Sequence, residues 1–166
     1  MLGKLFKKKE EIVQISMYAP VTGDLVVLED VPDPVFSQKM MGDGIAIKPV
    51  EETVTSPVDG EVIQLFPTKH AIGIRAKNGA EILIHIGLDT VNLEGEGFSA
   101  FVQEGDSVKA SDMLITFDSK VIAEKATSTL IPVIITNTDA MSEIIPFGKK
   151  ESVTAGEDVI LSVKKN

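Results

Sequence analysis

The sequence has 166 residues, of which 43% are hydrophobic and none is cysteine, so it allows one packed domain and excludes disulfides, thiolate zinc sites and cysteine nucleophiles. Its formal net charge of −9 repels phosphate backbones and argues against nucleic-acid binding. No apolar run reaches the roughly 18 residues that span a bilayer, and the N-terminus lacks the apolar stretch of a signal peptide, so a cytoplasmic protein is expected.

Residues 1–17 are expected to form a flexible N-terminal arm, followed by one domain over residues 18–166. Within the arm, Leu2, Leu5 and Phe6 have the spacing of one helical face and are surrounded by lysines. One turn of apolar residues is too short to hold a helix on a membrane by itself. A solvated arm is therefore favoured over a weak membrane-surface helix.

Beyond residue 18 the chain alternates between turn signals and short β-branched runs. Turn signals such as "VPDP", "SPVDGE" and "QEGD" separate runs such as "EVIQL", "EILIHI" and "DVILSV". This alternation predicts an antiparallel β-sandwich or a partly closed barrel. Helical periodicity is brief, and residues 33–41 and 119–126 are the best helix candidates. The expected fold class is all-β with a few short helical turns.

Two stretches of the sequence resemble each other. The segments "APVTGDLVVL" at residues 19–28 and "SPVDGEVIQL" at residues 56–65 share Pro, Val, Gly and Leu at matching places. Each reads as a turn that leads into a strand. A duplicated half of the domain and convergent turn chemistry explain this likeness equally well.

The chain has two histidines, His70 and His85, and both flank one expected hairpin. Asn78 and Gly79 tolerate the positive φ angles of a two-residue type I′ turn, which would pair residue 72 with residue 85. The histidines would then be diagonal neighbours on one face of the sheet, together with residues 72, 74 and 83. A three-residue turn would shift the register by one residue and send the histidines to opposite faces.

Both faces of this hairpin are apolar, although only one is expected to face the core. Residues 82, 84 and 86 suit the core, which leaves the histidine face as a docking patch. Burying an unpartnered polar group costs roughly 2–7 kcal/mol, so two imidazoles on an apolar face indicate binding rather than burial. Core histidines bonded to backbone carbonyls are the alternative.

Three chemistries fit a pair of imidazoles. Zinc needs three or four protein ligands, and Asp89 is a candidate third, so zinc fits best at a site shared with a partner. A serine triad is disfavoured because no G-x-S-x-G motif occurs. In the third chemistry, one neutral imidazole attacks phosphorus and the other donates to the phosphoryl oxygens. No Walker-A spacing is present, so another protein would have to phosphorylate the histidine.

The segments "TKHAIGI" at residues 68–74 and "ILIHIGLDTVNLEGEGF" at residues 82–98 resemble the glucose-family IIA component of the bacterial sugar phosphotransferase system. The likeness includes "VPDPVFSQKMMGDGIAIKP", "SPVDGEV" and "EKATSTLIPVIITN" and covers about residues 18–163. It implies an all-β sandwich with a shallow apolar depression around the histidines. Family members also occur fused to a sugar permease, whereas the short arm and early end of this chain lead us to expect a free-standing protein.

The resemblance implies roles for individual residues. His85 would accept a phosphoryl group through Nε2 from phosphorylated HPr and pass it to the cysteine of a IIB domain. His70 would hold the phosphoryl group, and Thr68 would orient His70 through a hydrogen bond. The docking surface for these partners would consist of Asp33, Val35, Phe36, Met40, Met41, Phe66, Leu83, Asp89 and Val91.

The resemblance also bears on cofactors and partners. It implies a covalent phosphohistidine and no cofactor, with zinc bound by His70 and His85 only at a partner interface. The expected partners are HPr, the IIB domain of a sugar permease and regulatory targets. Membrane contact is expected only through the permease or weakly through the N-terminal arm, and the protein is expected to be a monomer. Lys69, Gly73 and Leu83 differ from the enteric pattern, which leaves the preference among partners open.

A biotin- or lipoyl-type carrier domain is the main alternative from another class. The segment "FVQEGDSVKASDMLITFD" resembles the repeated turn and strand units of those modules. Such a carrier needs its modified lysine at the tip of a tight hairpin, usually beside methionine. Lys77 occupies the visible hairpin tip without that context, so this alternative is disfavoured.

Overall fold

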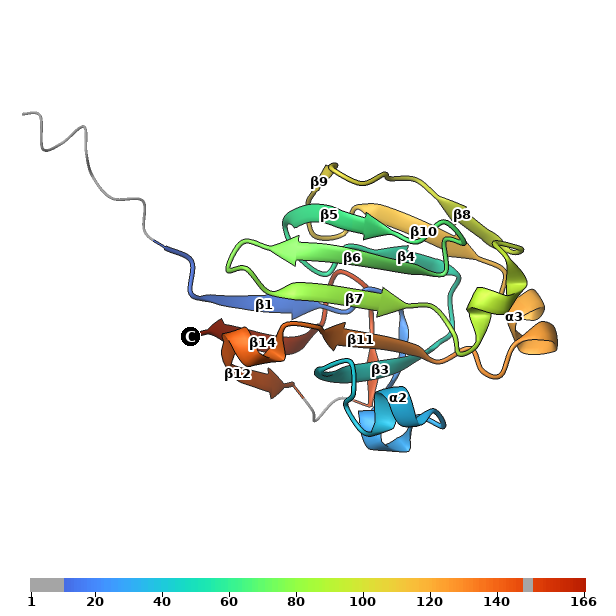
Figure 1. The fold of residues 1–166 in the computed structure, drawn as a ribbon, viewed down its shortest axis with the longest axis horizontal. Helices are drawn as coiled ribbons and strands as arrows, with labels where there is room; N and C mark the ends of the chain where they lie inside the picture. Colours follow the sequence, from blue (N-terminus) through green and yellow to red (C-terminus); the bar gives the residue numbers. More distant parts are fainter. Residues whose placement is uncertain (1–10, 148–150) are drawn as a thin grey trace, which may run out of the picture.

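The computed structural model describes residues 11–147 and 151–166, which form antiparallel sheets with short helical segments (Figure 1). The strands are β1 (Gln14–Tyr18), β2 (Gly23–Val26), β3 (Asp43–Pro49), β4 (Thr53–Thr55), β5 (Gly60–Leu65), β6 (Ala71–Ala76), β7 (Glu81–His85), β8 (Phe98–Ala100), β9 (Ser107–Val108), β10 (Met113–Phe117), β11 (Ile131–Ile135), β12 (Met141–Pro146), β13 (Ser152–Val153) and β14 (Val159–Lys165). The helical segments are η1 (Leu28–Asp30), α2 (Pro34–Ser37), η2 (Thr90–Leu93), α3 (Ser119–Lys125) and η3 (Thr138–Ala140).

The described strands form three sheets. An eight-stranded sheet has the order β13-β2-β3-β11-β7-β6-β5-β9, and two three-stranded sheets have the orders β1-β14-β12 and β4-β10-β8. Met17 of β1, Ile84 of β7 and Leu114 of β10 are all fully buried in one core, so the sheets pack against each other as a sandwich. The expected all-β sandwich is confirmed. The sheets are not closed into a barrel, so of the two forms expected the sandwich describes the fold.

The middle of the eight-stranded sheet is buried on both faces. All five residues of β11 are buried, as expected for a continuous apolar run at the centre of a sheet. Val133 faces the main core, whereas Ile134 belongs to a second apolar cluster on the other face. We call this second set the histidine-side cluster, and its buried members are Leu28, Val31, Phe36, Ala46, Ala71, Leu83, Leu88 and Ile134.

The strand pairings repeat within the chain. β2 lies between β3 and β13 as β5 lies between β6 and β9, and β14 lies between β1 and β12 as β10 lies between β4 and β8. The two sets of strands meet where β11 pairs with β7. The matching stretches at residues 19–28 and 56–65 lead into β2 and β5, which occupy equivalent places. A duplicated half therefore explains the likeness better than convergent turn chemistry.

A second pair of turns supports this duplication. Ser111 and Gly156 both have positive φ, at 79° and 75°, and lie just before β10 and β14. In each turn an aspartate accepts a hydrogen bond from a backbone amide that precedes the positive-φ residue, at 2.8 Å from Lys109 N and 2.8 Å from Thr154 N. These equivalent bonds reproduce the same local structure in both halves.

Both expected helices form, but they are shorter than predicted. In α2, the Asp33 side chain caps the helix by accepting from Val35 N at 3.0 Å, and Pro34 occupies the first turn. In α3, the Asp118 side chain accepts from the amides of residues 120 and 121. Neither helix exceeds the seven residues of α3, and no described helix is long and apolar enough to cross a membrane.

The expected domain boundary at residue 18 is too late. Residues 14–17 belong to β1, which pairs with β14, and Met17 is fully buried. The sandwich therefore includes the last residues that were assigned to the N-terminal arm. The apolar residues Leu2, Leu5 and Phe6 of the expected arm lie outside the described residues.

Candidate functional site

The predicted register of the histidine hairpin is wrong by one residue. β6 pairs with β7 so that Ala71 lies opposite His85 and Ile72 opposite Ile84. Ala76 N also donates to the carbonyl of Ala80 at 2.8 Å, so the pairing continues past the ends of the strands and leaves three residues, 77–79, in the turn. Residues 72 and 74 therefore face the main core, not the histidine side as predicted.

The histidines are nevertheless neighbours. Their ring centroids are 5.0 Å apart, with an angle of 77° between the rings. Regular alternation in this register would put them on opposite faces, but His70 precedes β6 and follows a tight turn. In that turn Lys69 has a positive φ of 60°, and its amide donates to the carbonyl of Phe66 at 2.7 Å. The turn directs the His70 ring toward His85, the last residue of β7.

His85 is held in one tautomer by the backbone. Its Nδ1 lies 2.8 Å from the carbonyl oxygen of Gly87, and only a protonated Nδ1 can donate to that acceptor. Nδ1 therefore carries the hydrogen, and in the neutral ring Nε2 has the free lone pair. His85 is half-buried, so part of its ring remains exposed at the surface.

His70 is buried, with an exposed fraction of 3%, and it contacts the Thr68 side chain. Thr68 Oγ1 and His70 Nδ1 are 2.6 Å apart. Burial lowers the pKa of His70 from 6.5 to about 4, and the neighbouring His85 adds to this effect. His70 is therefore neutral at pH 7.

The pKa of His85 is under opposing influences. Burial lowers it below the usual 6.5, while the Gly87 carbonyl and the carboxylates of Asp33 and Asp89 raise it. Both acids are held by hydrogen bonds: Asp33 accepts from Val35 N, and Asp89 accepts from the hydroxyl of Thr127. Burial is the strongest of these influences, so the pKa of His85 lies below its usual value despite the two carboxylates.

Aromatic side chains enclose the two imidazoles. The Phe36 ring centroid lies 5.2 Å from that of His85, and the Phe66 centroid lies 5.4 Å from that of His70. Phe36 belongs to the histidine-side cluster, and Phe66 packs against it. Each imidazole therefore packs against one phenyl ring and against the other imidazole, which restricts its orientation.

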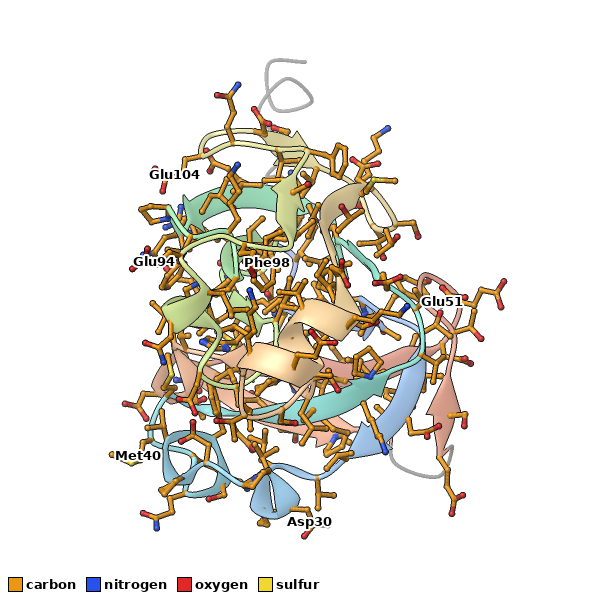
Figure 2. The ribbon with its side chains drawn as sticks, turned by 90° about the vertical axis from the view of Figure 1, so that its right-hand side faces the viewer. Asp30, Met40, Glu51, Glu94, Phe98 and Glu104 are labelled. Atoms are coloured by element: carbon orange, nitrogen blue, oxygen red, sulfur yellow. The ribbon has the colours of Figure 1, made fainter. Side chains whose placement is uncertain are left out.

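The predicted apolar docking residues differ in exposure. Val35, Met40 and Val91 are exposed by 38%, 69% and 52%, and Figure 2 shows Met40 projecting outward. Phe36 and Leu83 are only 4% and 5% exposed, so they support the surface from beneath and offer a partner little contact area. Met41 and Phe66 are partly buried against the histidine-side cluster.

The family model described as "phosphoenolpyruvate-dependent sugar phosphotransferase system, EIIA 1" matches residues 15–141. The chain belongs to this family.

Individual relatives agree along nearly the whole chain. The glucose-specific EIIA component of the phosphotransferase system from Oceanobacillus iheyensis is 58% identical over 164 residues, covering 98% of this chain and 99% of the relative. That from Bacillus cereus is 59% identical over 144 residues, covering 87% of each chain. The solved structure of glucose permease IIA from Mycoplasma capricolum is 40% identical and superposes with a TM-score of 0.82, covering 95% of this chain and 97% of that chain.

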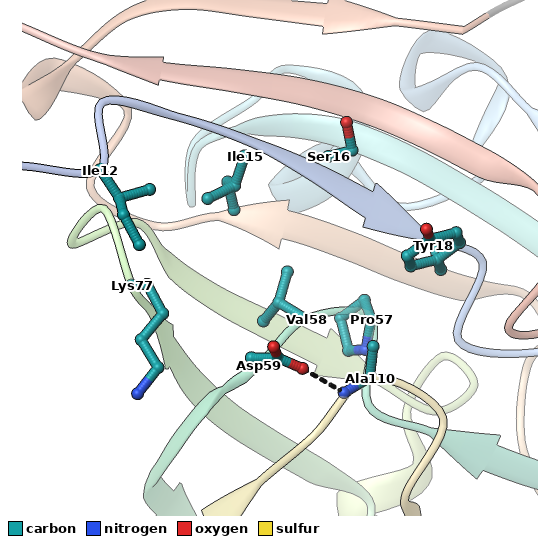
Figure 3. Close-up of a pocket in the computed structure, with 9 residues that line it drawn as sticks. All are labelled: Ile12, Ile15, Ser16, Tyr18, Pro57, Val58, Asp59, Lys77 and Ala110. Atoms are coloured by element: carbon teal, nitrogen blue, oxygen red, sulfur yellow. Dashed lines mark hydrogen bonds between the residues drawn. The ribbon is translucent and has the colours of Figure 1, made fainter. Parts of the chain in front are cut away.

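This IIA component also has a hollow away from the histidines. A groove of about 250 Å³ runs beside β1, and none of its lining residues was predicted as functional (Figure 3). Ile12, Ile15 and Val58 give it an apolar wall, and Asp59 accepts from Ala110 N at 2.9 Å at its margin. Lys77, which the carrier alternative needed as a modified lysine, lines the same groove.

The structure also bears on metal binding. Among residues 11–147 and 151–166, no group of three or more His, Cys, Asp or Glu side chains is arranged to hold a metal ion. Asp89 therefore does not form such a group with His70 and His85.

Two contributors to the site were missed from the sequence. Gly87 supplies the carbonyl that selects the His85 tautomer. The glycine in "HIGLD" was the available signal, since glycine is the usual residue at a positive φ such as the 78° found here. Thr127 bonds to Asp89 from 38 residues away in the chain, and no local pattern announces that contact.

Proposed function

We propose that this IIA component carries phosphoryl groups on His85, receiving them from phosphorylated HPr and passing them to the cysteine of a IIB domain. The observation that supports this most is the hydrogen bond between His85 Nδ1 and the Gly87 carbonyl, with the His70 ring 5.0 Å away. One imidazole is thereby left with a free Nε2, and a second lies within reach of whatever that nitrogen binds.

His85 Nε2 is the nucleophile in this proposal. Its lone pair forms a new P–N bond while the P–N bond to the donor breaks, and the bonding pair remains on the imidazole nitrogen of HPr. Positive charge develops on the His85 ring during the attack. The Gly87 carbonyl and the carboxylates of Asp33 and Asp89 stabilise that positive charge, as their raising effect on the pKa of His85 indicates.

His70 stabilises the transferring group. In this proposal the Thr68 hydroxyl, 2.6 Å from His70 Nδ1, donates to that nitrogen, so the neutral ring carries its hydrogen on Nε2 and donates it to a phosphoryl oxygen. A neutral donor suits this step because its hydrogen bond needs no change of charge as the phosphoryl group arrives and leaves. The low pKa of His70, about 4, keeps it in that form at pH 7.

The onward step uses the same atoms in reverse. The sulfur of the IIB cysteine attacks phosphorus, the P–N bond to His85 breaks, and its pair returns to Nε2. Because Nδ1 keeps its hydrogen on the Gly87 carbonyl throughout, His85 emerges ready for another cycle. No nucleotide or cofactor enters either step.

The surface around His85 suits protein partners that bring positive charge and apolar side chains. Val35, Met40 and Val91 expose apolar area beside two held carboxylates, and the whole chain has a net charge of −9. Electrostatic attraction of this kind speeds encounter more than it adds affinity. The glucose-specific names of the curated relatives support glucose as the sugar of the partner permease.

The test is phosphorylation with phosphoenolpyruvate, enzyme I and HPr, followed by intact-mass detection. One phosphoryl group that is acid-labile and alkali-stable is expected. His85→Ala should abolish the gain in mass, whereas His70→Gln should accept the group and fail to deliver it to IIB. An acid-stable product, or full sugar phosphorylation by His70→Gln, would refute the assignment.

A further inference from the structure

The loop that follows α3 is hydrogen-bonded to the segment that follows His85. Leu88 N donates to the carbonyl of Ser128 at 2.9 Å, and Thr127 N donates to the carbonyl of Leu88 at 3.1 Å. These two bonds form an isolated antiparallel bridge between residues 88 and 128. The loop is therefore fixed to the segment that connects His85 to η2.

The same loop contacts the residue that orients His85. A Cβ atom on Gly87 would lie 3.0 Å from the carbonyl oxygen of Ser128, so the two backbones are packed without room for a side chain. The Gly87 carbonyl accepts from His85 Nδ1. The loop therefore helps to fix the position of Gly87, and the Gly87 carbonyl in turn orients the His85 ring.

Asp89 has an unusual backbone conformation, and its carboxylate bonds to the loop that follows α3. Its φ of 61° and ψ of 22° place it in the left-handed region, which is uncommon for a residue other than glycine. Although it precedes η2 directly, its side chain makes no capping hydrogen bond with that segment. Instead, Asp89 Oδ2 accepts from the Thr127 hydroxyl.

The two acids near His85 are held in different ways. Asp33 is fixed by a backbone amide, that of Val35 at 3.0 Å, which only a proline at residue 35 would remove. Asp89 depends on one side-chain hydroxyl, and the bond joins groups at the exposed rim of the site. A single substitution can therefore release one anion and leave the other in place.

We propose that Thr127 is a positioning residue, which acts through Asp89 by fixing its carboxylate beside His85 for the phosphoryl donor's positive charge. This inference rests on the proposed phosphocarrier function of His85 for its biological meaning. The hydroxyl restricts the carboxylate to one rotamer, so a cation on the donor meets an anion that is already in place. Preorganised charge of this kind contributes through binding, because nothing has to be rearranged during the encounter.

The kinetic test compares Thr127→Val, Thr127→Ser and a matched control in the same loop. Thr129→Val is the control because the Thr129 hydroxyl makes no hydrogen bond with any described residue. Thr127→Val should raise KM for phosphorylated HPr by about three- to tenfold with kcat changed by less than about twofold. Thr127→Ser, which keeps the hydroxyl, should restore wild-type KM, and Thr129→Val should match wild type.

A second measurement does not depend on phosphotransfer. The groups that face His85 are Asp33, Asp89 and His70, so release of Asp89 should lower the titration midpoint of His85 measured by NMR. We expect Thr127→Val to lower it by about 0.3 pH unit and Asp89→Asn to lower it by at least as much.

The outcomes separate this inference from the proposed function. If wild-type protein is not phosphorylated but Thr127→Val still lowers the midpoint, the function fails and the positioning role stands. If Thr127→Val leaves both the midpoint and KM at wild-type values while Asp89→Asn changes them, Thr127 does not position the carboxylate. A loss that Thr127→Ser fails to restore would also overturn the inference.

Discussion

Gly87→Ala should destabilise the fold more than a glycine substitution at the hairpin tip. A Cβ at residue 87 would lie 2.6 Å from Cγ2 of Thr90, 3.0 Å from the carbonyl oxygen of Ser128 and 3.2 Å from Cγ2 of Ile122. The first distance requires a shift, because real Cβ atoms do not approach so closely. Overpacking in such a site costs about 1–3 kcal/mol.

Backbone conformation adds to this cost. At a φ of 78° an alanine costs about 1–2 kcal/mol relative to glycine, which gives about 2–5 kcal/mol in total for Gly87→Ala. Gly79 provides the matched control because its φ is 92° and a Cβ there has nothing within 4 Å. Gly79→Ala should therefore cost only the conformational part, about 1–2 kcal/mol.

Urea unfolding of the three proteins at pH 7.5 measures the difference in the free energy of unfolding. Gly87→Ala is expected to be less stable than Gly79→Ala by about 1–3 kcal/mol. Gly87→Ala should also be phosphorylated more slowly, because relief of the clash moves the carbonyl that holds His85 Nδ1. Equal stability of the two variants, within about 0.5 kcal/mol, would refute the crowding argument.

Three further predictions concern other hydrogen bonds and charges. Asn78→Asp should destabilise the protein by about 2–4 kcal/mol, because the buried amide donates to two backbone carbonyls at 3.1 Å each, and equal urea midpoints would contradict this. Stability should fall as pH drops from 6.5 toward 4, because in this range residue 70 is protonated in the unfolded state but not in the folded state, where the pKa of His70 is about 4. The free energy of unfolding should depend less steeply on pH in His70→Gln. Thr68→Val should lower the rate of transfer to IIB roughly tenfold, measured with pre-phosphorylated protein, because His70 is no longer oriented; an unchanged rate would contradict that role.

The strands were predictable because their signals are local. Runs such as "EILIHI" and "DVILSV" alternate in hydrophobicity and lie between turn residues, so each could be recognised without knowledge of its partner. The motifs around the histidines were also sufficient for the family, which the comparison at residues 15–141 confirms. Both successes depend on residues that are close together in the chain.

The hairpin register failed for a reason outside the hairpin. Asn78 and Gly79 favour a two-residue turn, but the Asn78 side chain instead donates to the carbonyl of Val13, just before β1, and to that of Val163 within β14. These tertiary bonds fit a three-residue loop. The neighbouring histidines were predicted from the wrong register, and the turn at Lys69 is what brings them together.

The supporting contacts of the site were out of reach for the same reason. Asp33 could be recognised as a helix cap from "VPDP", but its position beside His85 depends on how α2 packs over the histidine-side cluster. The bond between Thr127 and Asp89 joins residues 38 positions apart. Sequence patterns identify which groups can react, whereas the fold decides which groups hold them in place.

The most direct test of the account is to ask which nitrogen carries the phosphoryl group. Protein labelled with ¹⁵N-histidine would be phosphorylated through HPr and examined by ³¹P and ¹⁵N NMR. Because the Gly87 carbonyl occupies His85 Nδ1, the phosphorus signal should couple to Nε2 of His85. Coupling to Nδ1 of His85, or to either nitrogen of His70, would contradict it.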